Sequence, residues 1–465
     1  MLKNLNMLDA QLKRPPLDSG RPGPVHKATL MPSTLPKTRA DQPAGPESFL
    51  SRRAQWAESP PISYLMHMAL ARPELISLAA GFVDQQTLPV EPTRTALEAL
   101  WTADDARAAL QYGTTAGFAP LREQILARHL KADGRLAAET NLSLEQVVIT
   151  AGSNQLLHLV GDTLFDPGDI VLCAAPSYFV FLGLLTSLGV RAVGVDCDEN
   201  GLIPEALEAH LARLDAAGEI GRVKAIYVTT YFDNPGNVTL SAERRPEIVA
   251  IAKRWSQTGK IHVIEDAAYR ELRYQGDDLP SLRAYDEQGD TVIVAGTFSK
   301  SYSPGVRVGW GLLPPALVKP LLHQKGNIDF GSPNFAQHLI SKVLDLGLFD
   351  THVEQLRQSY RVKLETMLSA ADQFLRPLPG VEWLRPSGGL YVWLGLPEHI
   401  DTGPSGRLLQ EALEQGVLYV PGEYCYPLEG EPVARNMIRL SFGVQSPENI
   451  RRGIEKLSEA IRRVG

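Results

Sequence analysis

Six short apolar runs, separated by stretches with helical spacing, constrain the fold of this chain more than any other feature. Runs of this kind, apolar on both faces and ending in a turn or a polar cluster, are typical of strands in a parallel sheet that helices cover on both sides. We therefore expect an α/β fold whose ligands bind beyond the carboxyl ends of the strands. The runs are residues 147–150, 170–173, 191–195, 225–228, 261–264 and 291–294.

Changes in composition and in hydrophobic periodicity along the chain predict four segments. Residues 1–46 hold eight prolines and no sustained periodicity, so we expect a disordered tail that cannot bury enough apolar surface to offset its ordering entropy. Residues 47–90 are expected to form an N-terminal arm that packs with a small domain. We expect a large domain over 91–345 and a smaller α+β domain over 346–465. Helical spacing marks residues 49–58, 62–71, 121–130 and 447–464.

Composition excludes several classes of protein. The chain has 465 residues, 44% of them hydrophobic, and a formal net charge of -7, which argues against a nucleic-acid partner bound by an overall basic field. No window is apolar enough for a membrane helix, so no membrane partner is expected. Cys173, Cys197 and Cys425 are far apart, which favours a reducing, cytoplasmic location, and no spacing of metal ligands is present, so no metal is expected.

Polar residues follow four of the predicted strands, at the edge where ligands are expected. A small-residue turn that opens a helix offers free N–H groups to a phosphate, although a plain helix cap has the same sequence. A lysine among hydroxyls is usually a solvated loop residue, but it can also form a Schiff base with an aldehyde cofactor whose ring nitrogen a carboxylate keeps protonated. The residues are Gly152, Ser153, Asn154, Asn234, Asp266, Tyr269, Thr297, Ser299, Lys300 and Arg307.

This combination resembles the fold-type-I pyridoxal-phosphate enzymes of the class I/II aminotransferase superfamily, and is most similar to the aminoadipate/kynurenine aminotransferase branch. The resemblance runs from about residue 47 to the C-terminus. It implies pyridoxal 5'-phosphate as cofactor, a seven-stranded-type sheet in a PLP-binding domain over 91–345, and a homodimer with shared active sites. It rests on Asn234-Pro235, Asp266-x-x-Tyr269, Ser299-Lys300 and Pro304-Gly305-x-Arg307-x-Gly309.

The resemblance also implies the catalytic roles. Lys300 would hold the cofactor as a Schiff base and carry a proton between the substrate α-carbon and the cofactor, with a pKa lowered by burial and by Arg307. Asp266 would pair with the pyridinium nitrogen. Tyr269 and Asn234 would donate hydrogen bonds to the phenolic oxygen.

Further residues are expected to bind the cofactor or the substrate. Tyr178 would stack on the cofactor ring, and Arg439 would clamp the substrate carboxylate as a planar fork meets a planar anion. Gly81 and Asn234 would contact the substrate. Residues 388–393 resemble a small-domain strand and are expected to be structural. The phosphate would be held by Gly152, Ser153, Asn154, Thr297, Ser299, Arg307 and Tyr112 of the neighbouring subunit.

The sequence departs from this branch in the substrate region. Ser63 stands where the branch carries an arginine that engages acidic side chains, although Arg52 or Arg53 could substitute for it. The proline that usually follows the glycine turn at Gly81 is missing. Transamination of an amino acid and a 2-oxo acid by a ping-pong mechanism is the function we expect. A lyase that cleaves a C–S bond or a β-substituent on the same scaffold is the alternative, because its residues would look alike.

Overall fold

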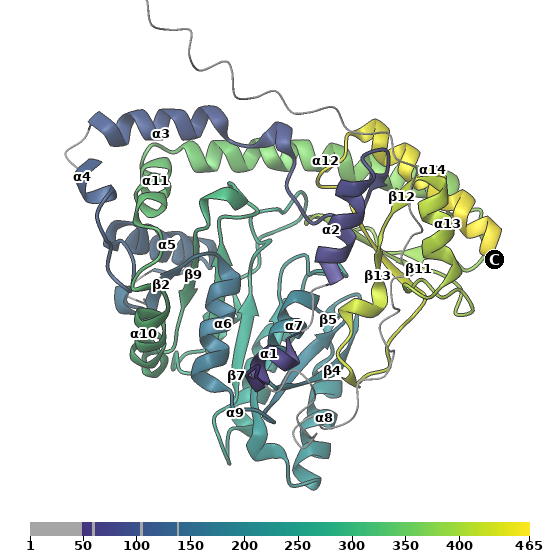
Figure 1. Cartoon of the computed structure of the whole chain (residues 1–465). Coiled ribbons are helices and arrows are strands. Elements are labelled where there is room, and N and C mark those ends of the chain that lie inside the picture. Colours follow the sequence, from purple (N-terminus) through teal and green to yellow (C-terminus); the bar gives the residue numbers. More distant parts are fainter. Residues whose placement is uncertain (1–48, 58–60, 103–105, 137–138) are drawn as a thin grey trace, which may run out of the picture. The chain divides into compact units, whose positions relative to one another are not determined.

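The central sheet is mostly parallel, which confirms the fold class expected from the six apolar runs (Figure 1). The computed structural model describes residues 49–57, 61–102, 106–136 and 139–465, and the predicted tail over 1–46 lies outside them. The strands are β2 Val147–Thr150, β3 Ile170–Ala175, β4 Arg191–Asp198, β5 Gly201–Leu202, β6 Val223–Thr229, β7 His262–Asp266, β8 Val292–Thr297, β9 Gly309–Leu312 and β14 Glu429–Gly430. Their order is β14-β4-β3-β6-β7-β8-β9-β2, and β5 pairs with β4 alone.

β9 is a strand that the sequence analysis did not predict. It runs antiparallel to both of its neighbours, and Gly309 is paired with Thr297 of β8 and with Thr150 of β2. Two of its four residues are glycines, a type depleted in strands. A Cβ atom on Gly311 would lie 2.6 Å from the Leu156 side chain, so this glycine lets α6 approach the sheet closely.

Helices cover both faces of the central sheet. Alternate residues of β2 enter different cores: Val147 and Ile149 pack on the face covered by α5, α8, α9 and α11, whereas Val148 packs on the face covered by α6, α7 and α10. The helices of this region are α3 Val90–Thr102, α4 Ala106–Ala109, α5 Ala119–Ala132, α6 Ser153–Leu164, α7 Phe179–Ser187, α8 Pro204–Ala216, α9 Arg244–Trp255, α10 Pro315–Asp329 and α11 Asn334–Asp345.

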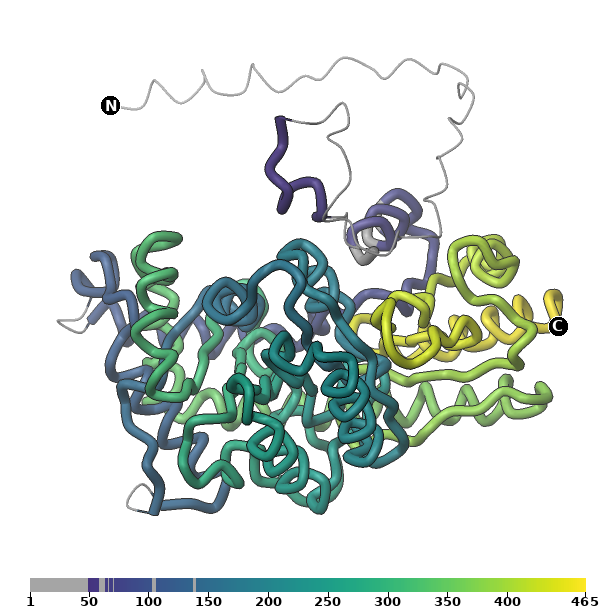
Figure 2. Tube along the Cα trace, turned by 90° about the horizontal axis from the view of Figure 1, so that it is seen from below, coloured from purple at the N-terminus to yellow at the C-terminus, as the bar shows by residue number. Residues whose placement is uncertain are grey.

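A second, antiparallel sheet has the order β10-β11-β15-β13. Figure 2 shows its strands grouped with the C-terminal helices, and together they enclose a separate hydrophobic core. The elements are β10 Glu382–Trp383, β11 Tyr391–Gly395, β13 Val420–Pro421, β15 Met437–Ser441, α12 Leu348–Phe374, α13 Arg407–Gln415 and α14 Pro447–Val464. A two-residue strand, β1 Ile76–Ser77, pairs in parallel with β12 Val417–Leu418.

The 27-residue helix α12 links the core on one face of the central sheet to the core of the second sheet. Phe349 and Val353 pack in the core of the central sheet, and Tyr360 and Met367 pack in the core of the second sheet. A helix of this length spans roughly 40 Å, which is enough to reach both (Figure 1). The helix therefore fixes how the ends of the central strands face the second sheet.

The N-terminal helices contact both groups of elements. In α1, Arg52–Trp56, Arg53 forms a 2.7 Å ion pair with Asp162 of α6. In α2, Pro61–Ala71, Leu65 is buried in the core of the second sheet. No helix in the described ranges is long and apolar enough to cross a membrane. The short 3-10 helices are η2 Gln85–Thr87, η4 Leu144–Gln146, η5 Ile220–Arg222, η6 Leu282–Tyr285, η7 Pro304–Val306 and η8 Gly422–Cys425.

Candidate active site

Lys300 lies just beyond the carboxyl end of β8, at the edge where ligands are expected. The Thr297 hydroxyl at the end of β8 accepts the Ser299 N–H at 3.1 Å, a local bond that turns the chain toward Lys300. Lys300 Nζ donates to the Gly81 carbonyl oxygen at 2.7 Å. Burial lowers the pKa of Lys300, Arg439 and Arg307 lower it further, and Tyr391 opposes them. The lowered pKa leaves more of the amine neutral and nucleophilic.

Asp266 is a buried carboxylate at the end of β7. Its Oδ2 accepts the Tyr227 hydroxyl at 2.9 Å and its Oδ1 accepts the Ala268 N–H at 3.1 Å. Burial raises its pKa, although both hydrogen bonds act in the opposite direction. Among the described residues it has only these neutral donors and no ion pair, so its charge has room for a cationic ligand atom.

Arg439, in β15 of the second sheet, is the buried cation of the site. Its side chain donates from Nη1 to Asn234 Oδ1 at 2.7 Å and from Nη2 to the Ala79 carbonyl at 2.8 Å, whereas Nε has no hydrogen-bond partner among the residues that the structure describes. The residue is 1% exposed and forms no ion pair with a described residue. A buried guanidinium of this kind suits a carboxylate ligand, because the two oxygens of a carboxylate can accept two parallel N–H hydrogen bonds from it.

Tyr269 and Tyr391 meet at the centre of this cluster. Their hydroxyl oxygens are 3.1 Å apart, and a Cβ atom on Gly81 would lie 2.8 Å from Tyr391 Oη. Gly81, Lys300 and the two tyrosines are therefore neighbours. The sequence analysis assigned Tyr391 only a structural role within residues 388–393, and it did not single out Tyr227, which is hidden inside an apolar strand.

The start of α6 and Arg307 form a cradle. Gly152 precedes α6 with φ of 87°, and Arg307 follows η7 with φ of 51°. Arg307 Nη2 donates to the Ala151 carbonyl at 3.0 Å, and a Cβ atom on Gly152 would lie 2.5 Å from that nitrogen. Only glycine allows this approach of a guanidinium to a helix N-terminus, where the helix dipole and the arginine both favour an anion. Asn154, in the first turn, lies beside Tyr178 and partly offsets the effect of burial, which raises the pKa of that tyrosine.

Some predicted residues lie outside the cluster. Tyr112 is 82% exposed and packs edge-to-face on Phe330, with ring centroids 5.6 Å apart. Ser63 is exposed on α2, and the ion pair with Asp162 occupies Arg53. Within the described part of the chain, no group of three or more His, Cys, Asp or Glu could hold a metal ion.

Residues 73–457 match the family model of aminotransferase class I and II. The chain belongs to this family. An aromatic-amino-acid aminotransferase of Thermococcus litoralis is 34% identical over 90% of this chain and 94% of that protein. A 2-aminoadipate transaminase of Thermus thermophilus is 33% identical over 84% of this chain and 91% of that protein. The kynurenine aminotransferase of Pyrococcus horikoshii, solved with PMP, has a TM-score of 0.82 at 33% identity and covers 90% of this chain and 98% of its own.

These relatives confirm the resemblance to the aminoadipate/kynurenine branch, the fold-type-I architecture and pyridoxal phosphate as the cofactor of this aminotransferase. The residues fit that cofactor. The cradle at Gly152 and Arg307 suits a phosphate, and Asp266 is a buried anion that forms no ion pair with any described residue. Lys300 supplies an amine whose pKa is lowered.

Proposed function

We propose that Lys300, Arg439 and Asp266 carry out the transfer of an amino group between an amino acid and a 2-oxo acid. One observation carries the proposal: the site holds a buried cation, Arg439, and a buried anion, Asp266, and neither has an ionic partner among the described residues. Each charge is costly in the protein alone and is matched by a ligand group of opposite sign. Pyridoxal phosphate, when bound, withdraws electrons and so acidifies the α-carbon of the substrate.

Around that chemistry, the Lys300 amine would remove the proton from the substrate α-carbon and deliver it to the C4′ carbon of the cofactor. Arg439 orients the substrate by its carboxylate, and the same clamp serves the amino acid and the 2-oxo acid in turn. Asp266 keeps the ring nitrogen protonated. Asn234 and Tyr269 donate to the phenolic oxygen, and Gly81 gives the substrate room beside Lys300.

We assign the cradle to the cofactor phosphate and the face of Tyr178 to the cofactor ring. Arg307 has a guanidinium that can bind two phosphate oxygens. Asn154 lies beside Tyr178. The phosphate ligands in this proposal are Gly152, Ser153, Asn154, Thr297, Ser299 and Arg307.

The clamp is tested with two variants of Arg439. R439A should raise the KM for both the amino acid and the 2-oxo acid by about 100-fold, because each loses a charge-assisted bidentate pair, worth about 1.5–3 kcal/mol or more. R439K should recover part of that loss. An amine that lacks the carboxylate should react equally slowly with all three proteins. Equal losses for the amine and the amino acid would contradict the assignment.

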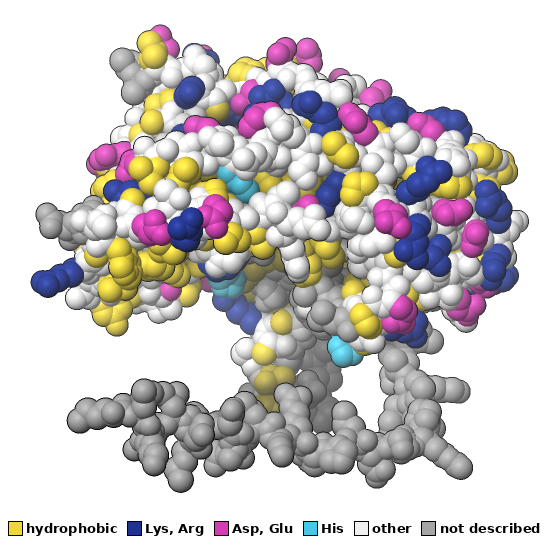
Figure 3. All heavy atoms as spheres, turned by 90° about the horizontal axis from the view of Figure 1, so that it is seen from above, with side chains coloured by type: hydrophobic (Ala, Val, Ile, Leu, Met, Phe, Trp, Pro, Cys, Tyr) yellow, Lys and Arg dark blue, Asp and Glu magenta, His cyan; other side chains and the backbone are white. Residues whose placement is uncertain are grey.

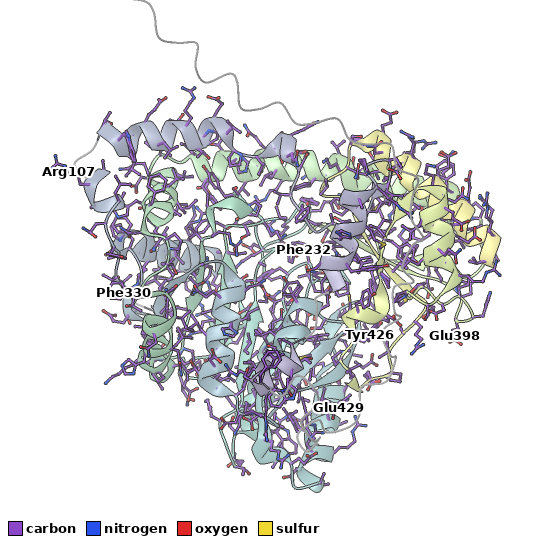
Figure 4. The ribbon with its side chains drawn as sticks, viewed as in Figure 1. Arg107, Phe232, Phe330, Glu398, Tyr426 and Glu429 are labelled. Atoms are coloured by element: carbon purple, nitrogen blue, oxygen red, sulfur yellow. The ribbon has the colours of Figure 1, made fainter. Side chains whose placement is uncertain are left out.

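We further propose a homodimer in which two active sites are shared. An apolar edge, defined by exposed side chains on α3, α4 and the junction of α10 with α11, supports it (Figure 3). Figure 4 shows Phe330 at the same edge as Arg107. Tyr112, which packs on Phe330, would reach the phosphate of the second copy. The edge comprises Trp101, Leu110, Tyr112, Ile328, Phe330 and Phe335, which are 37–82% exposed.

The domain limits and the location of the enzyme also belong to this proposal. Residues 91–345 would form the cofactor-binding domain, 346–465 the small domain, and 47–90 an N-terminal arm that packs with the small domain. The hydrophobic core of the second sheet, which is distinct from the two cores on the faces of the central sheet, supports this division. A cytoplasmic location is supported by free thiols at all three cysteines.

A further inference from the structure

We propose that Tyr391 is a positioning residue of the active site, whose hydroxyl makes Tyr269 a stronger hydrogen-bond donor and through Tyr269 sets how readily the Lys300 nitrogen is protonated in the loaded enzyme. The inference rests on the proposed roles of Lys300 and Tyr269 and goes beyond them. It assigns a function in acid–base control to a residue that the strand motif over 388–393 presents as structural.

The backbone and ring of Tyr391 are held from three sides. The residue begins β11, is 1% exposed and is paired with Ser441 of β15. Its carbonyl accepts Asn237 Nδ2 at 2.6 Å. Its ring faces the Arg439 guanidinium, with Cζ 4.4 Å from the ring centroid. A tyrosine held in this way cannot redirect its hydroxyl without disturbing the carboxylate clamp.

The Tyr391 hydroxyl points at Tyr269. The two oxygens are 3.1 Å apart, and the rings meet edge-to-face at 77° with centroids 5.9 Å apart. When Tyr391 donates, the proton of Tyr269 is free for a ligand, and the accepted bond polarises the Tyr269 hydroxyl into a stronger donor. Burial raises the pKa of Tyr269 well above its usual value, so the Tyr269 hydroxyl keeps its proton at neutral pH and can complete a relay of hydrogen bonds from Tyr391 through Tyr269 to a ligand.

The same hydroxyl also touches the turn that holds Lys300. Tyr391 Oη would lie 2.8 Å from a Cβ atom on Gly81, whose carbonyl accepts Lys300 Nζ at 2.7 Å. Tyr391 therefore lies beside the lysine as well as beside Tyr269. Among the described residues, the titratable or charged groups that face Lys300, Tyr269 and Tyr391 from the surrounding elements are Tyr178, Arg307, Tyr360 and Arg439, and Asp266 in turn faces Tyr178.

The test is a pH titration of the visible absorption band of the loaded enzyme, which reports protonation of the Lys300 nitrogen. Strong donation by Tyr269 to the phenolic oxygen of the cofactor disfavours a proton on that nitrogen. Y391F keeps the ring and removes the donor, so the midpoint should rise by about 0.5–1 pH unit, the size expected for one hydrogen bond. An unchanged or lower midpoint would overturn the proposal.

A double-mutant cycle tests whether the effect passes through Tyr269. Y269F should raise the midpoint at least as much as Y391F, and adding Y391F to Y269F should give no further shift. Additive shifts would show that Tyr391 acts without Tyr269 and would contradict the relay. Y419F is the matched control, because it removes an equally buried hydroxyl that donates to the Thr402 carbonyl at 2.9 Å outside the site, and its midpoint should equal that of wild type.

Difluorotyrosine at position 391 should shift the midpoint in the opposite direction from Y391F. It tests the proposal even if Y391F does not accumulate as a folded protein. Fluorine makes the hydroxyl a stronger donor without changing its place, so the midpoint should fall. A midpoint that rises or does not move would overturn the relay. Failure of the proposed function looks different: the wild-type enzyme itself would then lack the absorption band or would show no reaction with amino acids.

Discussion

Arg439 carries its charge in a nearly closed environment, where water cannot solvate it. Its contacts are an amide oxygen, a carbonyl oxygen and aromatic ring faces, all of which are neutral. Asp266 is the matching case with opposite sign. Buried charges of this kind destabilise the ligand-free protein, and they bind ligand groups of opposite charge strongly. Active sites commonly lose stability in favour of function in this way.

Lys300 leads to a prediction about pH. Burial, together with Arg439 and Arg307, lowers the pKa of its amine, so the neutral form is reached at a lower pH than for an ordinary lysine. The rate at which cofactor-free protein captures pyridoxal phosphate should therefore rise with pH and level off below the usual lysine pKa of about 10.4. Stopped-flow absorbance between pH 6 and pH 10 measures this rate.

The control for that measurement is R439A, which removes one of the two positive charges that lower the Lys300 pKa. Its rate profile should move to higher pH than that of wild type. A wild-type profile that still rises steeply at pH 10, or that is identical in R439A, would show that Lys300 behaves as an ordinary solvated lysine.

At the scale of elements, the glycines of β9 determine how closely α6 approaches the sheet. G311A adds a methyl group at 2.6 Å from the Leu156 side chain, which must move within a packed core. We expect a loss of about 1–3 kcal/mol in the free energy of unfolding. Because α6 opens at the cradle, the affinity for pyridoxal phosphate should fall as well. Chemical denaturation and cofactor titration measure the two effects.

G183A is the matched control for G311A. Gly183 lies in α7, and a Cβ atom there would meet nothing within 4 Å. The same substitution should therefore raise the free energy of unfolding by about 0.5–1 kcal/mol, because alanine favours a helix over glycine. Equal losses in the two variants would contradict the steric explanation.

The elements differ in how far the sequence predicts them. β2 and α14 have the predicted bounds, because a run of β-branched residues and an amphipathic helix that begins at a proline are strong local signals. β9 has no such signal, since its glycines are selected by contacts with α6. Tyr391 could not be assigned for the same reason: its neighbour Tyr269 is 122 positions away, and only the fold brings them together.

At the scale of the whole molecule, the apolar edge predicts the state of assembly. F330D places a charge at a side chain that is 61% exposed, so it should leave the fold unchanged and split the dimer. The separated protein should also bind pyridoxal phosphate more weakly, because Tyr112 of the second copy is lost. Analytical ultracentrifugation and cofactor titration measure the two effects.

L428D is the control for F330D. Leu428 is 69% exposed but does not belong to the apolar edge. The L428D variant should remain a dimer with wild-type affinity for the cofactor. A wild-type protein that sediments as a monomer, or an F330D variant that stays dimeric, would contradict the proposed assembly.

The proposal that Lys300 carries the proton during transfer of an amino group is tested by a half-reaction. Loaded enzyme is mixed with single amino acids without a 2-oxo acid while the visible spectrum and free ammonia are followed. We expect one equivalent of 2-oxo acid per active site, loss of the absorption band and no ammonia, and no such conversion in K300A. Continued release of ammonia would make the enzyme a lyase, and full activity of K300A would show that the lysine was assigned wrongly.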